Sequence, residues 1–363
     1  MNLIEMAEKA SLRAAETAKR FGVEALFLNA PMRQAAGVEM TAAVSEAGGL
    51  GVLAAAHLSP EKIVQAAQAI RNRTEKPFAV SLAIRPRHYP QAQGAETLFD
   101  GLAPLLEDLG LAGTPEAYDL TGATVFPAFD EQFEAALSVA PQAMISTFGG
   151  FREPEAEKLE AKGILNFGCA TTLKEAKVLR SAGVDAIVIQ GAAAGGPRWS
   201  FENADDVLVA TEGLVEEAAR ATGLPIIAAG GLASSASFAS ALLAGASGVM
   251  LGTALLTTEE SRMTDTARSA WHWAGAADLV LSRAFCGRLE RVLRSPMTEA
   301  LESYDSSVPA WPAPLALFLP IWEKAAEQGR DELFVLPAGQ GIGRSHWRTV
   351  REALAAYEAL IGR

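Results

Sequence analysis

Two glycine turns late in the sequence have residue types and spacing that suit the binding of an anion. One short apolar run ends at Gly230 and Gly231, and a second ends at Gly252 and Thr253. Glycine allows a close approach of the backbone, and bare N–H groups beside a helix start point toward a bound anion. The pattern therefore predicts a phosphate-binding place at the ends of these two runs.

The other short apolar runs are followed by few ionisable side chains. No paired carboxylates, no His/Cys/Asp/Glu cluster with metal-ligand spacing and no G-x-S-x-G motif occur there. Gly, Gln, Ser and Met predominate instead, and these residues do little acid–base chemistry alone. The sequence thus favours a site that holds a reactive cofactor, and it predicts no metal.

The apolar runs that carry these residues alternate with helical patterns along the chain. They lie at 25–28, 50–54, 77–82, 143–147, 164–167, 186–190, 225–229 and 248–251. Eight buried parallel strands alternating with helices are typical of an α/β fold of the (β/α)8 TIM-barrel type, in which the loops after the last two strands usually bind phosphate. A doubly wound open sheet shares the alternation, but the G-x-G-x-x-G fingerprint is absent after the first run, so we favour the barrel.

Two stretches interrupt the alternation and define the predicted domains. Residues 85–128 form a long insertion after the third strand, which we expect to be a lid or rim. We interpret 1–262, with this insertion, as the barrel and 263–335 as a cap over its mouth. Within the cap, helices are predicted over 263–277 and 322–328 and a strand over 279–285. Residues 336–363 are predicted to return to the barrel as a loop and a helix.

The composition is that of an ordinary globular protein. Of 363 residues, half are apolar and 20% are charged, and the net charge is -12 without a basic patch. This balance argues against nucleic acid and anionic membranes as partners. Two cysteines exclude a disulfide framework and fit a cytoplasmic location.

Residues 221–258 carry no charged side chain, which could suggest a membrane span. Pro225 and the glycines divide this stretch into short elements, so we expect it to be buried in a barrel instead. The oligomeric state stays open, a homo-oligomer included.

Seven motifs occur in order along nearly the whole chain. They are NAPM at 29–32, SEAGGLGVLAA at 45–55, VDAIVIQGAAAGG at 184–196, IIAAGGLASSASFASALLAGASGVMLGT at 226–253, TEES at 258–261, RAFCGR at 283–288 and AGQGIG at 338–343. As a set they resemble the nitronate monooxygenase family, formerly called 2-nitropropane dioxygenase, and the related enoyl-acyl-carrier-protein reductases. The resemblance implies an FMN-binding TIM barrel, with O2 as the oxidant in the monooxygenases and NAD(P)H as the reductant in the reductases.

The resemblance also implies which residues bind the FMN. The residues so implied are Ala30, Pro31, Met32, Ser81, Gln190, Gly195, Gly196, Gly230, Gly231, Met250, Leu251, Gly252 and Thr253. The backbone at 30–32 would border the flavin ring, Gln190 would hydrogen-bond its polar edge, and the glycines would meet the ribityl phosphate. We expect Pro197, Arg198 and Trp199 to line the substrate pocket, with Arg198 as an anion partner and Trp199 as an apolar wall.

The chain departs from the family pattern at two positions. Ser81 stands where the family has Asn, and its shorter hydroxyl weakens that contact. Pro197 stands where the family's A-G-G-H motif has its catalytic His, and proline can neither accept a proton nor donate a backbone N–H. A neutral nitroalkane must lose a carbon-bound proton, whereas a nitronate has already lost it. We therefore expect neutral nitroalkanes to be poor substrates.

No residue is assigned as catalytic, and His57 is the one candidate. It follows the second strand, at the barrel end where active sites form, and an exposed rim histidine is the alternative. His88 lies in the insertion, while we interpret His272 as a helix or cap-packing residue and His346 as a solvated one. Four tryptophans are expected to pack the cap against the barrel, namely Trp271, Trp273, Trp311 and Trp322.

These observations predict an FMN-dependent oxidoreductase, specifically an oxygenase that oxidises nitronates or a related small organic substrate with O2. Two alternatives stay open. One is an NAD(P)H-dependent reductase of enoyl thioesters or quinones. The other is a flavin-binding protein without turnover, which the loss of the His at Pro197 favours.

Overall fold

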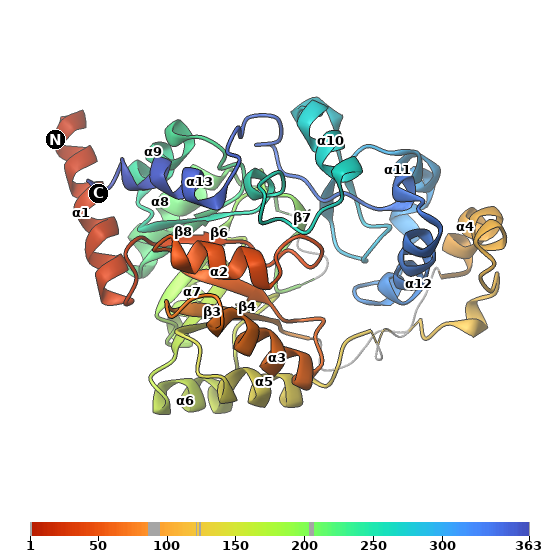
Figure 1. Ribbon diagram of the computed structural model, residues 1–363, viewed down its shortest axis with the longest axis horizontal. Helices are drawn as coiled ribbons and strands as arrows, with labels where there is room; N and C mark the ends of the chain where they lie inside the picture. Colours follow the sequence, from red (N-terminus) through yellow and green to blue (C-terminus); the bar gives the residue numbers. More distant parts are fainter. Residues whose placement is uncertain (1, 86–94, 121, 123–124, 203–206, 363) are drawn as a thin grey trace.

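Eight parallel strands form the centre of the molecule, and helices surround them (Figure 1). The computed structural model describes residues 2–85, 95–120, 122, 125–202 and 207–362. The barrel strands are β1 (Phe27–Asn29), β2 (Gly51–Ala54), β3 (Phe78–Ala83), β4 (Ala143–Thr147), β5 (Leu165–Ala170), β6 (Ala186–Gln190), β8 (Ile226–Ala229) and β9 (Gly248–Leu251). Their order is β1-β9-β8-β6-β5-β4-β3-β2, and every paired neighbour is parallel. This confirms the predicted (β/α)8 fold.

The buried side chain of Asn29 closes the barrel between its first and second strands. Its amide nitrogen donates to the Val52 carbonyl at 2.8 Å, and its amide oxygen accepts from the Val52 N–H at 2.8 Å. The Leu50 N–H adds a bond to the Phe27 carbonyl at 2.9 Å. A side chain thus supplies the hydrogen bonds that a regular ladder would make, so the buried backbone groups at this seam are satisfied.

Nine of the described helices surround the barrel. They are α1 (Leu3–Arg20), α2 (Val38–Glu46), α3 (Pro60–Arg71), α5 (Phe129–Ser138), α6 (Glu153–Ala161), α7 (Leu173–Ser181), α8 (Thr211–Thr222), α9 (Ser235–Ala244) and α13 (Val350–Glu358). Ser59, Thr172 and Ser234 each accept a backbone N–H of the first turn that follows. No described helix combines the length and the apolar character that a bilayer crossing requires. The uncharged stretch 221–258 is divided among β8, α9 and β9, as predicted.

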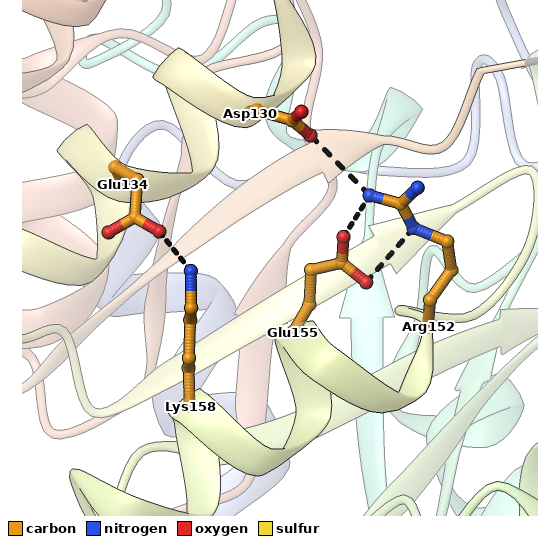
Figure 2. A network of polar contacts seen from close by, with 5 residues as sticks. All are labelled: Asp130, Glu134, Arg152, Glu155 and Lys158. Atoms are coloured by element: carbon orange, nitrogen blue, oxygen red, sulfur yellow. Dashed lines mark hydrogen bonds and ion pairs between the residues drawn. The ribbon is translucent and has the colours of Figure 1, made fainter.

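Helices α5 and α6 are joined on the outside of the barrel by charged side chains (Figure 2). Arg152 pairs with the buried Glu155 and reaches Asp130 at 3.4 Å, and Lys158 pairs with Glu134. Only Glu155 in this network is largely removed from solvent. The network therefore ties two neighbouring helices together on the outside of the barrel.

The insertion after β3 and the segment after residue 263 pack together beside the barrel. Helix α4 (Ala95–Leu109) shares one apolar cluster with α11 (Pro296–Leu301) and α12 (Ala313–Gln328), and Figure 1 shows these helices grouped at the far side of the molecule from α1. The sequence indicated no clean period in this insertion, so α4 was not predicted. Helix α12 begins nine residues before the predicted start at 322, because Pro314 lies in its first turn, where proline is tolerated.

A small antiparallel sheet connects this outer unit to the barrel. Its strands are β7 (Gly196–Pro197), β10 (Leu279–Ser282) and β11 (Glu290–Leu293), in the order β10-β11-β7. Helix α10 (Asp265–Trp273) precedes it. Short 3-10 turns lie at Pro115–Ala117, Thr253–Leu255, Ala276–Asp278, Glu302–Ser307 and Asp331–Leu333. The final helix α13 returns to the barrel, where Tyr357 packs against Phe27 and Phe238.

Candidate active site

A cavity of about 300 Å³ opens at the carboxyl ends of the barrel strands, between the barrel and the outer unit. Twelve of the residues predicted to bind the cofactor line it: Ala30, Pro31, Met32, Ser81, Gln190, Gly195, Gly196, Gly230, Gly231, Met250, Gly252 and Thr253. His57, Pro197 and Trp199 line it as well. Residues from six different strand ends are therefore brought to one place.

Leu251 and Arg198 do not line the cavity. Alternation along β9 turns Met250 toward the barrel interior and Leu251 toward the surrounding helices, where it is buried. Arg198 is only 3% exposed, and its guanidinium donates to the carbonyls of Gln190 at 3.1 Å and Gly191 at 2.8 Å. Burial lowers the pKa of Arg198 to about 10. Arg198 braces the loop after β6, which corrects its expected role as an anion partner in the pocket.

The loops after β8 and β9 line the cavity and contain backbone N–H groups that have no partner among the described residues. Within the described residues, the backbone N–H groups of Gly231, Leu232, Gly252 and Thr253 donate to no other atom of the protein. Gly230 and Gly231 have φ values of 109° and 77°, which side-chain-bearing residues rarely adopt. These turns lie beside the start of α9, so the place suits an anion such as a phosphate.

The loop 338–343 completes this end of the cavity. The Gly339 N–H donates to the Thr253 hydroxyl at 2.8 Å, and the Gln340 N–H donates to the Ala193 carbonyl at 2.8 Å. A Cβ atom on Gly195 would lie 2.4 Å from the carbonyl carbon of Ala338, so only glycine permits this contact. The predicted site omitted Gly341, which lines the cavity, although three glycines in six residues were the available signal.

Gln190 fixes the loop that carries Pro197 and Trp199. Its side-chain nitrogen donates to the Pro197 carbonyl at 3.0 Å, and its side-chain oxygen accepts from the Trp199 N–H at 2.8 Å. Each group of a primary amide can make a further hydrogen bond, because the nitrogen has two hydrogens and the oxygen has two lone pairs. Gln190 thus holds the wall of the cavity and keeps one donor and one acceptor for a bound molecule.

His57 lies on the cavity wall among positive charges. Burial lowers its pKa to about 4, and the charges of Arg33, Arg262 and Lys62 contribute to the shift. The imidazole is therefore neutral at pH 7 and is a weak base. Arg33 also lines the cavity, at its exposed rim. This side of the cavity favours a negatively charged molecule.

The other two histidines that the structure describes are not part of the cavity wall. His272 and His346 are both exposed, and neither lines the cavity. His272 lies in helix α10, as one of its two interpretations had it, and its exposed side chain does not pack the cap. His88 lies outside the described residues.

Aromatic side chains of the outer unit close the mouth of the cavity. Trp271, Trp311 and Trp322 line it, whereas Trp273 is 84% exposed and packs nothing against the barrel. The Trp311 ring lies 5.0 Å from that of Phe148, which directly follows β4. The tryptophans were expected only to pack the cap, so this aromatic wall was missed. The position of Phe148 directly after a strand was the one signal for it.

One carboxylate also lines the cavity and was not predicted. Glu290 in β11 is 4% exposed and pairs in register with Pro197 of β7. The Cys286 thiol hydrogen-bonds to it, and burial raises the pKa of that thiol, with the negative charge of Glu290 as the next contribution. Two segments distant in sequence meet here through an antiparallel ladder, which no local pattern indicates.

Comparisons with known proteins agree with this geometry. Probable nitronate monooxygenases of Staphylococcus haemolyticus (strain JCSC1435) and Staphylococcus aureus (strain Newman) are each 28% identical, over 320 and 324 residues. These alignments cover 86% and 88% of this chain and 87% and 89% of the relatives. The structure of nitroalkane oxidase from Streptomyces ansochromogenes matches with a TM-score of 0.84 and 27% identity, over 95% of this chain and 98% of that one.

A more distant structure has the same fold. FabK from Thermotoga maritima matches with a TM-score of 0.70 and 21% identity, over 96% of both chains. The profile of the family described as nitronate monooxygenase matches residues 16–355, which is nearly the whole sequence. The chain therefore belongs to the nitronate monooxygenase family.

Proposed function

We propose that this oxidoreductase is an FMN-dependent oxygenase that oxidises a nitronate, or a related small organic anion, with O2. The observation that carries the proposal is the group of unpaired N–H groups after β8 and β9, which open onto the same cavity as Met32, Gln190 and Arg33. An anion-binding end and a cationic rim in one cavity suit a phosphorylated cofactor and an anionic substrate together.

The residues present fit an FMN at this site. The N–H groups of Gly231, Leu232, Gly252 and Thr253 would hold the phosphate, because hydrogen bonds to a charged oxygen are stronger than those between neutral groups. The backbone at 30–32 would border the ring, and the spare donor and acceptor of Gln190 would meet its polar edge. When bound, the flavin supplies the exchange of electrons with substrate and with O2 that these side chains cannot perform.

The opposite end of the cavity would bind the substrate. Arg33 carries a positive charge at the rim, and His57 stays neutral beside it, so this wall offers a cation to a nitronate. Trp311, Trp322 and Phe148 would cover the substrate's apolar part and exclude water.

An anaerobic titration of the purified protein tests this proposal. The flavin absorbance near the visible maximum is recorded while ethyl nitronate is added, and a second sample receives NADH. We expect the nitronate to bleach the absorbance, air to restore it, and NADH to leave it unchanged. Bleaching by NADH alone would identify a reductase, and bleaching by neither would identify a flavin-binding protein without turnover.

We also infer a cytoplasmic location. The two cysteines, Cys169 and Cys286, are both free and buried, as is usual where thiols stay reduced. Fractionation of the source cells, with activity recovered in the cytoplasmic fraction, tests this inference.

A further inference from the structure

An apolar cluster lines the cavity across the barrel from the glycine turn after β9. Phe148 directly follows β4, which is four strands away from β9 in the order of the eight-stranded barrel, so the two strand ends lie on opposite sides of the mouth. The cluster members that line the cavity include Ala56, Ala83, Phe126, Phe148, Trp311 and Leu315. Glycine turns therefore line one side of the cavity, and carbon-rich side chains line the other.

Three aromatic rings of this cluster contact one another in a row. The Trp311 ring centroid lies 5.0 Å from that of Phe148 and 5.7 Å from that of Phe126. The rings come from the outer unit, from the loop after β4 and from the insertion after β3, so three distant segments contribute one ring each. Ring centroids at these distances attract one another, and a further flat ring can join such a group.

Arg288 supports two of these rings. Its guanidinium carbon lies 4.3 Å from the Phe148 ring centroid and 5.0 Å from the Trp311 ring centroid. The residue is 4% exposed, and it donates to the Ser200 carbonyl at 2.8 Å. A cation attracts the face of an aromatic ring, so this buried and anchored guanidinium stabilises the arrangement of both rings.

The backbone of Phe148 adopts a conformation that is unfavourable for a residue with a side chain. Its φ value of 63° lies in the left-handed region. Such strain persists only where the surroundings enforce it, and it is common at ligand-binding sites. The chain thus keeps an aromatic ring at the cavity wall where a glycine would be less strained.

The apolar cluster also adjoins the cationic side of the cavity. Ala56 of the cluster is followed directly by His57, and the positive charge of Arg33 acts on His57. Both His57 and Arg33 line the same cavity. A molecule that carries a negative charge and a flat apolar group therefore matches two neighbouring parts of the wall.

We propose that Phe126, Phe148 and Trp311 form a subsite for an aryl group, so that the substrates are arylalkyl nitronates. This inference rests on the proposed function and deepens it by naming the class of nitronate. A phenyl group against the three rings removes apolar surface from water on both partners, and ring–ring contact adds to that gain. A nitronate as small as ethyl nitronate leaves most of this wall uncovered.

Binding of two unreactive carboxylates tests the subsite without any redox step. Phenylacetate and propionate differ only in a phenyl group in place of a methyl group, and each has a planar anionic group like that of a nitronate. Isothermal titration calorimetry with the purified protein gives both dissociation constants. We expect phenylacetate to bind at least about tenfold more tightly, because its ring is buried.

Phe148→Gly removes one ring of the subsite and suits the left-handed backbone at that position. We expect it to lower the preference for phenylacetate at least about fivefold. Phe129→Ala is the matched control, because Phe129 is also half-buried and stacks on another ring, Phe133, but does not line the cavity. That control should keep the wild-type preference.

A second variant keeps the test decisive if Phe148→Gly does not fold. Phe126→Ala removes a half-buried ring from the insertion, and it should lower the preference in the same direction. Equal affinity for the two carboxylates in wild-type protein, no measurable binding of phenylacetate, or an unchanged preference in the variants overturns the assignment.

Oxygen consumption separates this inference from the proposed function. The nitronate of phenylnitromethane should give a kcat/KM at least about tenfold above that of ethyl nitronate, and Phe148→Gly should reduce this ratio mainly through KM. If the protein oxidises neither nitronate while its preference for phenylacetate still depends on Phe148, the proposed oxygenase activity fails and the subsite stands. Rapid oxidation of both nitronates with equal kcat/KM supports the oxygenase and contradicts the subsite.

Discussion

His57 stays neutral because of what surrounds it rather than because of a bonding partner. Burial disfavours its charged form, and the positive charges of Arg33, Arg262 and Lys62 act in the same direction. A proton acceptor with a pKa of about 4 binds a proton weakly at pH 7, so His57 is poorly matched to act as a general base. The one histidine favoured as a catalytic candidate from the sequence is thus better suited to a neutral wall beside Arg33.

The lowered pKa makes His57 a source of acid sensitivity. In the unfolded chain the imidazole titrates near 6.5, and in the folded protein it titrates near 4, so between these values the unfolded state binds more protons. Stability is therefore lost as the pH falls through this window. For this residue the loss between pH 7 and pH 5 is at most about 2 kcal/mol.

Urea unfolding at pH 7 and pH 5 checks this expectation. The difference in unfolding free energy between the two pH values should be smaller in His57→Gln than in wild type, because glutamine does not titrate. His272→Gln is the control, since that residue is exposed and should leave the difference unchanged. An identical pH dependence in wild type and His57→Gln would contradict the account.

At the scale of elements, the site depends on loops whose backbones contact each other at glycine residues. The loop after β6 and the loop 338–343 approach so closely that Gly195 has backbone atoms of Ala338 and Gly339 where a side chain would begin. The glycine motifs could be recognised in the sequence because each follows a strand or precedes a helix. The packing of loop 338–343 against the loop after β6 could not be recognised, because this contact joins segments that are distant in the sequence.

Gly195→Ala should separate these two loops. The added Cβ would lie 2.4 Å from the Ala338 carbonyl carbon, and backbone atoms on both sides cannot move aside as a flexible side chain would. We expect flavin affinity to fall at least about tenfold and unfolding free energy to fall by about 1–3 kcal/mol.

Flavin fluorescence titration and urea unfolding measure both effects. Gly213→Ala is the matched control, because an alanine there meets nothing within 4 Å and lies inside α8. That control should bind flavin normally and be unchanged or slightly more stable. Gly195→Ala protein with wild-type affinity would show that the loop contact does not shape the binding site.

At the scale of the whole molecule, local patterns predicted the barrel and long-range contacts decided the rest. All eight strands were located from short apolar runs. Strands that are buried on both faces of a parallel sheet have this apolar sequence pattern wherever they occur in the chain. The outer unit was predicted less well: α4 was missed, and α12 was predicted too short. Both helices contain a proline and gain much of their apolar packing from each other.

The wall of the cavity beside Pro197 depends most on such contacts. Glu290 reaches the cavity only because β11 pairs with the two-residue strand β7. Neither this pairing nor its register can be predicted from the local sequence. The cofactor side, in contrast, follows from glycines at strand ends, which the barrel topology alone brings together.

The central claim is that the unpaired N–H groups after β8 and β9 hold the phosphate of FMN. Titration of flavin-free protein with FMN and with riboflavin, which lacks the phosphate, tests it most directly. Several charge-assisted hydrogen bonds should make FMN bind at least about 100-fold more tightly, or roughly 3 kcal/mol. Equal affinity for the two flavins, or no binding of either, would contradict the claim.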